Sequence, residues 1–371
     1  MGNPPIRVRV GPKPYPVHVG RGLLARLPRL LASRAPGRRA VVITDARLAR
    51  SLGARVARSL RAAGWRVDAA ALPQGERAKS LAALVHLYGF LIDRRTERRT
   101  PLVAVGGGTV GDAAGFAAAT YFRGIPLVHV PTTLLAQVDS AIGGKTAVNH
   151  PLVKNAIGAF YQPVLVVADI DALASLPQPE LAAGMAEVVK YALVFDRSFA
   201  RWLDSSWRQA VELRQTAALI RLVRHCVRLK AAAAADDEKD LFGRRELLNF
   251  GHTFGHALEA ATGYRRFRHG EAVAWGMRVA VELSKGRGWL TERSERTLAE
   301  ALLRRLPSPS WPRGLRRGAL LAGLAGDKKV AGARNVFILL RGLGRPVRVR
   351  DVSRRELLRA IARTLKQARR P

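Results

Sequence analysis

The chain has 371 residues, of which 63 are Lys or Arg and 28 are Asp or Glu, for a formal net charge of +35. A hydrophobic content of 48% excludes a disordered polycation, and the single cysteine, Cys226, excludes a disulfide framework and a Cys-rich metal site. The length predicts two domains, each with its own core.

The basic excess consists of 52 Arg and 11 Lys and is spread over most of the chain. A nucleic-acid-binding protein gathers its basic residues in a stripe, an arm or a tail. Because the arginines here are scattered, even at the ends of apolar helices, a compositional bias toward Arg explains the charge at least as well. We therefore expect no specific nucleic-acid partner.

No segment has the pattern of a leader or a membrane span. Residues 1–10 lack the apolar core of a signal peptide. The longest apolar stretch, 101–122, contains three consecutive glycines and Asp112, which is typical of a strand, a turn and a helix. The sequence predicts a cytoplasmic protein without a membrane partner.

Short β-rich runs alternate with helical stretches in the first half of the chain, which predicts a parallel sheet covered by helices on both faces. The predicted strands are 6–10, 17–19, 40–44, 66–71, 102–105, 127–130 and 164–168, and the predicted helices are 46–64, 80–93 and 111–122.

Helical periodicity dominates after residue 177. The predicted helices are 179–194, 202–235, 245–261, 270–286, 291–305 and 353–370, with strands at 336–340 and 347–352. The predicted architecture is thus a Rossmann-like α/β domain over residues 1–177, followed by a mainly helical domain over residues 178–371.

Glycines stand directly between a predicted strand and a predicted helix. Gly106, Gly108 and Gly111 satisfy the spacing G-x-G-x-x-G, which lets the backbone approach a pyrophosphate at a helix N-terminus. The usual acidic residue about 20 positions later is missing, but Asp45, at the end of an earlier strand, could bind a ribose. A nucleotide site is favoured over a purely structural turn.

Four polar residues recur at helical spacing in the second half. Arg245, Asn249, His252 and His256 stand at i, i+4, i+7 and i+11, which would place them on one face of a predicted helix. Apolar neighbours favour a polar cavity over a solvated face for this stripe.

Three histidines and a glutamate indicate a possible metal centre. His252 and His256 are one turn apart, but the segment between them lacks the Glu of a zincin protease. His269 begins the next predicted helix, and Glu187 could supply a carboxylate. Spacing alone leaves a divalent metal and a structural role equally open.

Lysine is rare enough in this chain to be informative. Because a surface cation here is usually Arg, a Lys marks a position that suits a compact charge with an adjustable pKa. Such a set suits an anionic, phosphorylated substrate. Seven of the 11 lysines lie in segments singled out on other grounds: Lys79, Lys145, Lys154, Lys190, Lys230, Lys328 and Lys329.

Over essentially its whole length the chain resembles the 3-dehydroquinate synthase family. The matching segments are Pro73–Ser80, Gly106–Asp112, Tyr121–Ile125, Pro131–Thr133, Asp139–Thr146, Lys154–Asn155, Ala186–Tyr191, Leu248–Ala257, His269–Glu271 and Asp327–Lys329.

The resemblance implies a ligand set. It assigns a divalent metal, Zn²⁺ or Co²⁺, to Glu187, His252 and His269, and it leaves His256 as a substrate or proton-relay residue. The residues that it places around NAD are Asp45, Glu76, Lys79, Gly108, Thr109, Val110, Gly111, Asp112, Thr132, Thr133, Lys145, Lys154, Ala172, Leu173, Ala174 and Ser175.

The resemblance also implies a substrate site and a homodimer. The residues that it places around the substrate are Arg123, Asp139, Lys145, Asn155, Lys190, Lys230, Arg245, Asn249, His256 and Lys328 or Lys329. Of these, the predicted catalytic residues are Arg123, Lys145, Lys190, Lys230, Arg245, Asn249 and His256.

The implied activity belongs to the shikimate pathway of aromatic amino acid biosynthesis. Members of the family are carbon–oxygen lyases that convert 3-deoxy-D-arabino-heptulosonate 7-phosphate to 3-dehydroquinate and phosphate. The reaction combines transient oxidation by NAD, phosphate elimination, re-reduction and an intramolecular aldol closure.

The sequence departs from the family pattern at two places. Gln74 replaces a usual Asp near the expected adenosine end, and the stretch 230–249 is one residue longer, with the insertion expected near Leu241–Phe242. Arg245 rather than Arg244 is therefore the predicted substrate ligand.

Three alternative functions stay open. Another sugar phosphate cyclase, such as a valiolone-type synthase, would act on a substrate that has no carboxylate. A polyol dehydrogenase would not need so many cations, and a nucleic-acid-binding protein would show salt-dependent affinity without turnover.

Overall fold

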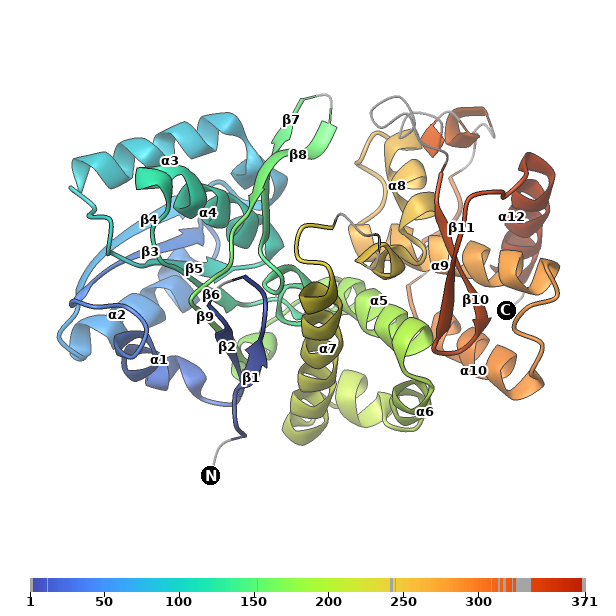
Figure 1. The fold of residues 1–371 in the computed structure, drawn as a ribbon, viewed down its shortest axis with the longest axis horizontal. Helices are drawn as coiled ribbons and strands as arrows, with labels where there is room; N and C mark the ends of the chain where they lie inside the picture. The colour runs from blue at the N-terminus through green and yellow to red at the C-terminus, as the bar shows by residue number, and fades with distance from the viewer. Residues whose placement is uncertain are drawn as a thin grey trace. The chain divides into compact units, whose positions relative to one another are not determined.

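Figure 1 shows the fold of the computed structural model, which describes residues 3–11, 13–151, 153–240, 243, 245–307, 309–312, 314–315, 318–321, 323–324 and 335–368. The chain divides into two compact units. The first consists of Met1–Leu181 and Arg214–Lys239, and the second of Ala182–Leu213 and Asp240–Pro371. The sequence predicted one boundary, between residues 177 and 178, and did not predict the return of 214–239 to the first unit.

The first unit holds most of the strands. These are β1 (Ile6–Val8), β2 (Tyr15–Gly20), β3 (Arg39–Asp45), β4 (Arg66–Leu72), β5 (Leu102–Gly106), β6 (Leu127–Pro131), β7 (Lys145–His150), β8 (Val153–Phe160) and β9 (Leu165–Asp169). Its helices are α1 (Leu23–Ala32), α2 (Ala54–Ala62), α3 (Leu81–Asp93), α4 (Gly108–Thr120) and α7 (Thr216–Asp236).

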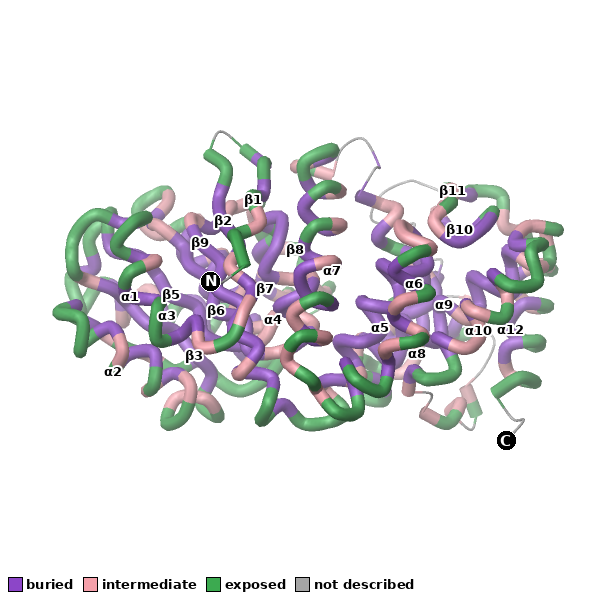
Figure 2. The backbone as a smooth tube through the Cα atoms, turned by 90° about the horizontal axis from the view of Figure 1, so that it is seen from below, coloured by how far each residue is buried: buried purple, intermediate pink, exposed green. Residues whose placement is uncertain are grey.

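Seven of these strands form one sheet in the order β1-β2-β9-β6-β5-β3-β4. Only β1 pairs antiparallel, and all other neighbours are parallel. Strands β5, β6 and β9 are buried along their whole length (Figure 2), as expected for parallel strands covered on both faces. The predicted α/β fold is confirmed.

Alternation along the strands builds two separate cores. Val42 points into a core shared with α1 and α2, whereas its neighbours Val41 and Ile43 point into a core shared with α3 and α4. Successive side chains of a strand face opposite sides of the sheet, so both helical layers are anchored by the same strand.

The second unit is mainly helical, as predicted. Its elements are α6 (Arg197–Ser205), α8 (His252–Ala261), α9 (His269–Gly286), α10 (Arg293–Arg304), α12 (Arg354–Ala368) and the antiparallel pair β10 (Phe337–Gly342) and β11 (Arg345–Val349). Helix α5 (Gln178–Phe195) begins in the first unit and continues into the second. No helix among the described residues is long and apolar enough to cross a membrane.

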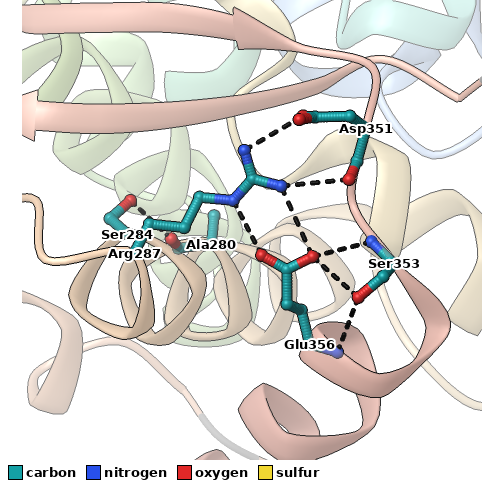
Figure 3. A network of polar contacts seen from close by, with 6 residues as sticks. All are labelled: Ala280, Ser284, Arg287, Asp351, Ser353 and Glu356. Atoms are coloured by element: carbon teal, nitrogen blue, oxygen red, sulfur yellow. Dashed lines mark hydrogen bonds and ion pairs between the residues drawn. The ribbon is translucent and has the colours of Figure 1, made fainter.

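A polar network fixes the C-terminal end of α9 to the start of α12 (Figure 3). The guanidinium of Arg287 donates to Glu356 at 2.9 Å and to the Asp351 carboxylate at 3.0 Å. Ser353 and Glu356 close a capping box at the N-terminus of α12. Because α9 begins at His269, this network also restrains the helix that carries a predicted metal ligand.

The predicted helix 202–235 is wrong. Helix α6 ends at Ser205, a π-helical segment covers Arg208–Glu212, and α7 begins at Thr216. Arg214 has φ 48° and Gln215 is extended, so helical hydrogen bonds cannot continue through them. The apolar periodicity on both sides of residues 206–215 is helical, so the sequence pattern did not reveal the break.

The structure predicts one pH-dependent contribution to stability. His129 lies on β6 beneath the glycine turn, and burial lowers its pKa from 6.5 to about 4. Since the unfolded chain protonates this residue more readily, its contribution is complete above pH 6.5 and is lost as the pH falls toward 4.

We expect the free energy of unfolding of the wild type, relative to His129→Gln, to fall by about 3 kcal/mol between pH 7 and pH 4. Urea unfolding at several pH values measures the difference. A difference that does not vary with pH contradicts the assignment.

Candidate active site and metal centre

Two glycine contacts bring α5, α8 and α9 together in the second unit. A Cβ on Gly270 at the start of α9 would lie 2.2 Å from the carbonyl oxygen of Ala183 in α5. A Cβ on Gly276 would lie 1.8 Å from the carbonyl oxygen of Gly251, the residue before α8. Only glycine permits such backbone contact, so these positions fix the spacing of the three helices.

One predicted metal ligand lies on each of these helices. Glu187 of α5, His252 of α8 and His269 of α9 offer ligand atoms that all lie within 4.8 Å of one another. Nε2 of His252 is 3.6 Å from Oε1 of Glu187, and Nε2 of His269 is 3.8 Å from the same oxygen. A divalent ion could therefore be reached by all three.

The carboxylate of Glu187 is the strongest sign of a missing cation. The residue is fully buried, and among the described residues neither oxygen accepts a hydrogen bond of ordinary geometry. The ammonium of Lys190, one turn later on α5, forms an ion pair with it. A buried carboxylate needs compensation, and one carboxylate with two imidazoles is a donor set that suits Zn²⁺ or Co²⁺.

An oxygen atom next to Nδ1 orients each of the two imidazoles. Nδ1 of His252 lies 3.4 Å from the carbonyl oxygen of Phe250, and Nδ1 of His269 lies 3.5 Å from Oε2 of Glu259. A proton on Nδ1 leaves Nε2 as the free electron pair, which is the tautomer that a metal ligand needs.

The charge around His269 is strongly negative. Desolvation would lower the pKa of His269, but the hydrogen bond to Glu259 and the charges of Glu187 and Glu259 outweigh it and raise the pKa. The same field would favour a bound cation.

Glu259 is a residue that the sequence reasoning missed. It lies seven positions after His252 on α8, so the same-face spacing could have identified it. With His256 and His269 it also forms a second group whose ligand atoms lie within 4.8 Å of one another. The two groups share His269, and its Nε2 faces Glu187 while its Nδ1 faces Glu259, so Glu259 is best understood as the residue that orients His269.

The predicted four-residue face of a single helix is wrong. Arg245–Asn249 form a 3₁₀ helix, and α8 starts only at His252. Gly251 has φ 82°, a left-handed conformation that ends one helix and starts another at a new angle. Arg245 is consequently buried, while Asn249 and His256 are exposed. Lys328, Lys329, Leu241, Phe242 and Arg244 lie outside the described residues.

In the first unit the predicted cofactor residues follow the carboxyl ends of parallel strands. Asp45 ends β3, the glycine turn follows β5, Thr132 and Thr133 follow β6, and Ala172–Ser175 come shortly after β9. Nucleotides bind at this edge in open α/β sheets. A Cβ on Gly107 would lie 3.1 Å from Cγ2 of Thr133, so the turn lies directly against the end of the neighbouring strand.

Asp112, just past the first turn of α4, forms an ion pair with the buried Lys79. Nζ of Lys79 lies 2.6 Å from Oδ2 of Asp112, and it also donates to the amide oxygen of Asn155. Burial raises the pKa of Asp112, and the charge of Lys79 opposes that rise. Asn149, which the sequence reasoning missed, donates to Glu76 at 2.7 Å. The structure thus joins four predicted ligands of NAD and substrate, Glu76, Lys79, Asp112 and Asn155, in one polar cluster.

The other predicted substrate- and cofactor-binding cations of the first unit lie in different surroundings. Lys230 of α7 forms an ion pair with Asp139. Arg123 is exposed in a turn where Phe122 and Arg123 have φ of 49° and 59°. Such strained backbone persists where the surrounding structure over-determines it, often at functional sites. Lys145 is exposed at the start of β7, and Lys154 is half-buried on β8.

Comparisons with known proteins identify the family of the chain. The sequence profile of the 3-dehydroquinate synthase N-terminal domain matches residues 69–183, and that of the C-terminal domain matches residues 184–330. A curated 3-dehydroquinate synthase from Pseudomonas fluorescens is 44% identical over 356 residues, which are 96% of this chain and 95% of that protein. The chain belongs to the 3-dehydroquinate synthase family.

Two solved structures of sugar phosphate cyclases are also similar. A 2-epi-5-epi-valiolone synthase from Streptomyces hygroscopicus, with NAD⁺ and Zn²⁺ bound, has a TM-score of 0.85 and 29% identity over 96% of this chain and 98% of that one. A 2-deoxy-scyllo-inosose synthase with carbaglucose-6-phosphate, NAD⁺ and Co²⁺ has a TM-score of 0.82 and 26% identity over 98% and 99%.

Removing the charge of Glu259 should weaken metal binding without removing a ligand. We expect Glu259→Gln to lower the affinity for Zn²⁺ about 10- to 100-fold, because the imidazole of His269 keeps a neutral acceptor but loses the negative charge that strengthens it as a ligand. Titration of the metal-free protein against a chromophoric chelator measures this. Glu300→Gln, which removes a carboxylate paired with Lys285 elsewhere in the unit, is the control. Unchanged affinity in Glu259→Gln excludes this role.

Proposed function

We propose that the protein is a 3-dehydroquinate synthase, a carbon–oxygen lyase that converts 3-deoxy-D-arabino-heptulosonate 7-phosphate to 3-dehydroquinate and phosphate. The observation that carries the proposal is the buried carboxylate of Glu187, which faces two oriented imidazoles and pairs with the ammonium of Lys190. The membership of the whole chain in this family supports the choice of reaction.

The cofactors would be NAD and a divalent ion, Zn²⁺ or Co²⁺. When bound, NAD takes up and returns electrons with no net redox change, and the ion stabilises negative charge on a substrate oxygen. Glu187, His252 and His269 would hold the ion. The strand ends at Asp45, the glycine turn and Thr132–Thr133 would hold the nucleotide, with the N-terminus of α4 facing its phosphates.

The chain's own cations would bind the anionic substrate. Lys190 is 1% exposed beside Glu187, so its charge acts in a medium that screens it weakly. Lys145, Lys230, Arg123 and Arg245 would neutralise the phosphate and the carboxylate, and Asp139 holds the ammonium of Lys230 in one position. His256 would pass a proton to or from the substrate.

Other predicted substrate contacts are polar and neutral. Asn155 and Asn249 could each donate and accept a hydrogen bond at a substrate hydroxyl. Asn155 already accepts from Lys79, so it would connect the substrate to the cofactor cluster.

A valiolone-type synthase is the second candidate, supported by the close structural likeness to such an enzyme. Its substrate class, represented by sedoheptulose 7-phosphate, has no carboxylate. The presence of Arg123, Lys230, Asn249 and His256 favours a carboxylated substrate. We further propose a cytoplasmic enzyme with no specific nucleic-acid partner.

Phosphate release is the decisive measurement. With NAD⁺ and Zn²⁺ or Co²⁺, we expect the purified protein to release phosphate from the heptulosonate phosphate and to form dehydroquinate without accumulating NADH. Steady accumulation of NADH would indicate a dehydrogenase. Turnover of sedoheptulose 7-phosphate in its place would indicate the valiolone-type reaction, and DNA binding without turnover a nucleic-acid-binding protein.

Loss of one imidazole should remove the ion. We expect His269→Ala to lose stoichiometric zinc and phosphate release while it keeps the circular dichroism spectrum of the wild type, because the side chain is partly exposed at the start of α9. Metal analysis after dialysis measures the zinc content. Retention of one zinc per chain would exclude His269 as a ligand.

A further inference from the structure

The side chain of Arg214 is bound to the segment that connects β9 to α5. Its Nη1 donates to the carbonyl oxygens of Leu173 at 3.0 Å and Ala174 at 3.2 Å. Its Nη2 donates to the carbonyl oxygen of Leu176 at 3.2 Å and to Oε1 of Gln178 at 3.0 Å. The chain returns to the first unit at Arg214, so all these groups belong to that unit. One guanidinium thus joins three backbone carbonyls to the first residue of α5.

The segment itself has few buried side chains. A 3₁₀ helix, Ile170–Leu173, ends where the segment begins, and the last carbonyl groups of a helix lack partners within the helix. Ala174, Ser175 and Pro177 are exposed, and a proline has no N–H to donate. Exposed segments of this kind open at little cost in free energy. The hydrogen bonds from Arg214 therefore contribute much of the order of this segment.

The backbone at Arg214 has a conformation that glycine adopts more easily. Its φ is 48°, in the left-handed region, where a side chain is strained. Arg95 has φ 49° and is also exposed, but among the described residues its guanidinium forms no hydrogen bond or ion pair. The abundance of Arg in the chain is enough to explain Arg95. The four hydrogen bonds are a feature of Arg214 alone in this pair, and they offset the strain of its backbone.

The four hydrogen bonds require a guanidinium. This group is planar, and its two terminal nitrogens direct two N–H groups each in fixed directions. A lysine has a single nitrogen with three N–H groups, so it cannot bind Leu173 and Gln178 at once from the two ends of a fork. A change of Arg214 to Lys therefore keeps the charge and loses most of the hydrogen bonds.

The segment lies at the edge of the sheet where a nucleotide would bind. Ala172–Ser175, which the family resemblance places around NAD, follow the carboxyl end of β9. The buried amide of Gln137 donates to the carbonyl oxygens of Pro131 at the end of β6 and Asp169 at the end of β9. This amide joins the start of the segment to the neighbouring strand end, and Arg214 fixes the remainder.

We propose that Arg214 is a positioning residue for NAD, which holds residues 173–176 in the conformation that binds the cofactor. A segment that is ordered before binding does not have to be ordered by the ligand, so the affinity is higher. The inference rests on the proposed function in one respect, the binding of NAD. It does not extend to the metal, because Glu187 lies further along α5, beyond the contact between Ala183 and Gly270.

The test compares Arg214→Gly with the matched control Arg95→Gly. Both variants relieve a left-handed backbone conformation, but only Arg214→Gly removes the four hydrogen bonds. Calorimetric titration of the full chain with NAD⁺, in the presence of Zn²⁺, measures the dissociation constant. We expect a rise of about 10-fold in Arg214→Gly, as when the segment holds its binding conformation about a tenth of the time. Arg95→Gly should bind NAD⁺ like the wild type, and Arg214→Lys should bind it as weakly as Arg214→Gly.

Two further measurements separate positioning from a general loss of structure. In Arg214→Gly we expect the KM for NAD⁺ to rise while kcat at saturating NAD⁺ and the zinc content stay at the wild-type values. Unchanged affinity for NAD⁺ in Arg214→Gly overturns the inference, as does wild-type affinity in Arg214→Lys or a loss of zinc together with NAD⁺. A wild type that binds no NAD⁺ overturns the proposed cofactor too, so the two failures are distinguishable.

Discussion

Burial of the Glu187 carboxylate is the constraint on which the second unit depends. A charge that is fully removed from water must be compensated, and Lys190 and two imidazoles are the groups that reach it. They reach it only because α5, α8 and α9 meet through glycines at backbone contact. Helix α9 is fixed in turn at its far end by the network of Arg287. The close packing of α5, α8 and α9 therefore both holds the unit together and positions its candidate metal ligands.

The charge of the chain separates into parts with different physical roles. Most arginines among the described residues are not buried. Lys79, Lys190 and Lys230 are buried, and each is held by a carboxylate: Asp112, Glu187 and Asp139. A lysine paired in this way is fixed in position, which suits the binding of an anion at one place. Helix α3 is the opposite case, an exposed helix with no cation in a strongly basic chain.

Much of the fold was predictable because its signals are local. The strand runs of the sheet, the glycine turn after β5 and the predicted helices 179–194, 270–286, 291–305 and 353–370 follow from short-range patterns, and the structure has an element at each of these places. The breaks were not predictable in the same way. At Gly251 the chain turns in a left-handed conformation and packs its carbonyl oxygen against Gly276 of another helix. In residues 206–215 an apolar periodicity continues through a segment that is not α-helical. The hairpin of β7 and β8, for which no strand was predicted, carries few buried side chains and thus a weak pattern.

The sequence by itself determined the family, the types of the candidate ligands and the alternation of strands and helices in the first half. It could do so because motifs and periodicity depend on residues that are close together in the sequence. Only the tertiary structure decided which nitrogen of His269 faces Glu187, that Glu259 lies next to its other nitrogen, and that Lys79 bridges Asp112 and Asn155. Each of these facts joins residues that are distant in the chain. Such contacts depend on how helices and strands pack, which a local pattern does not specify.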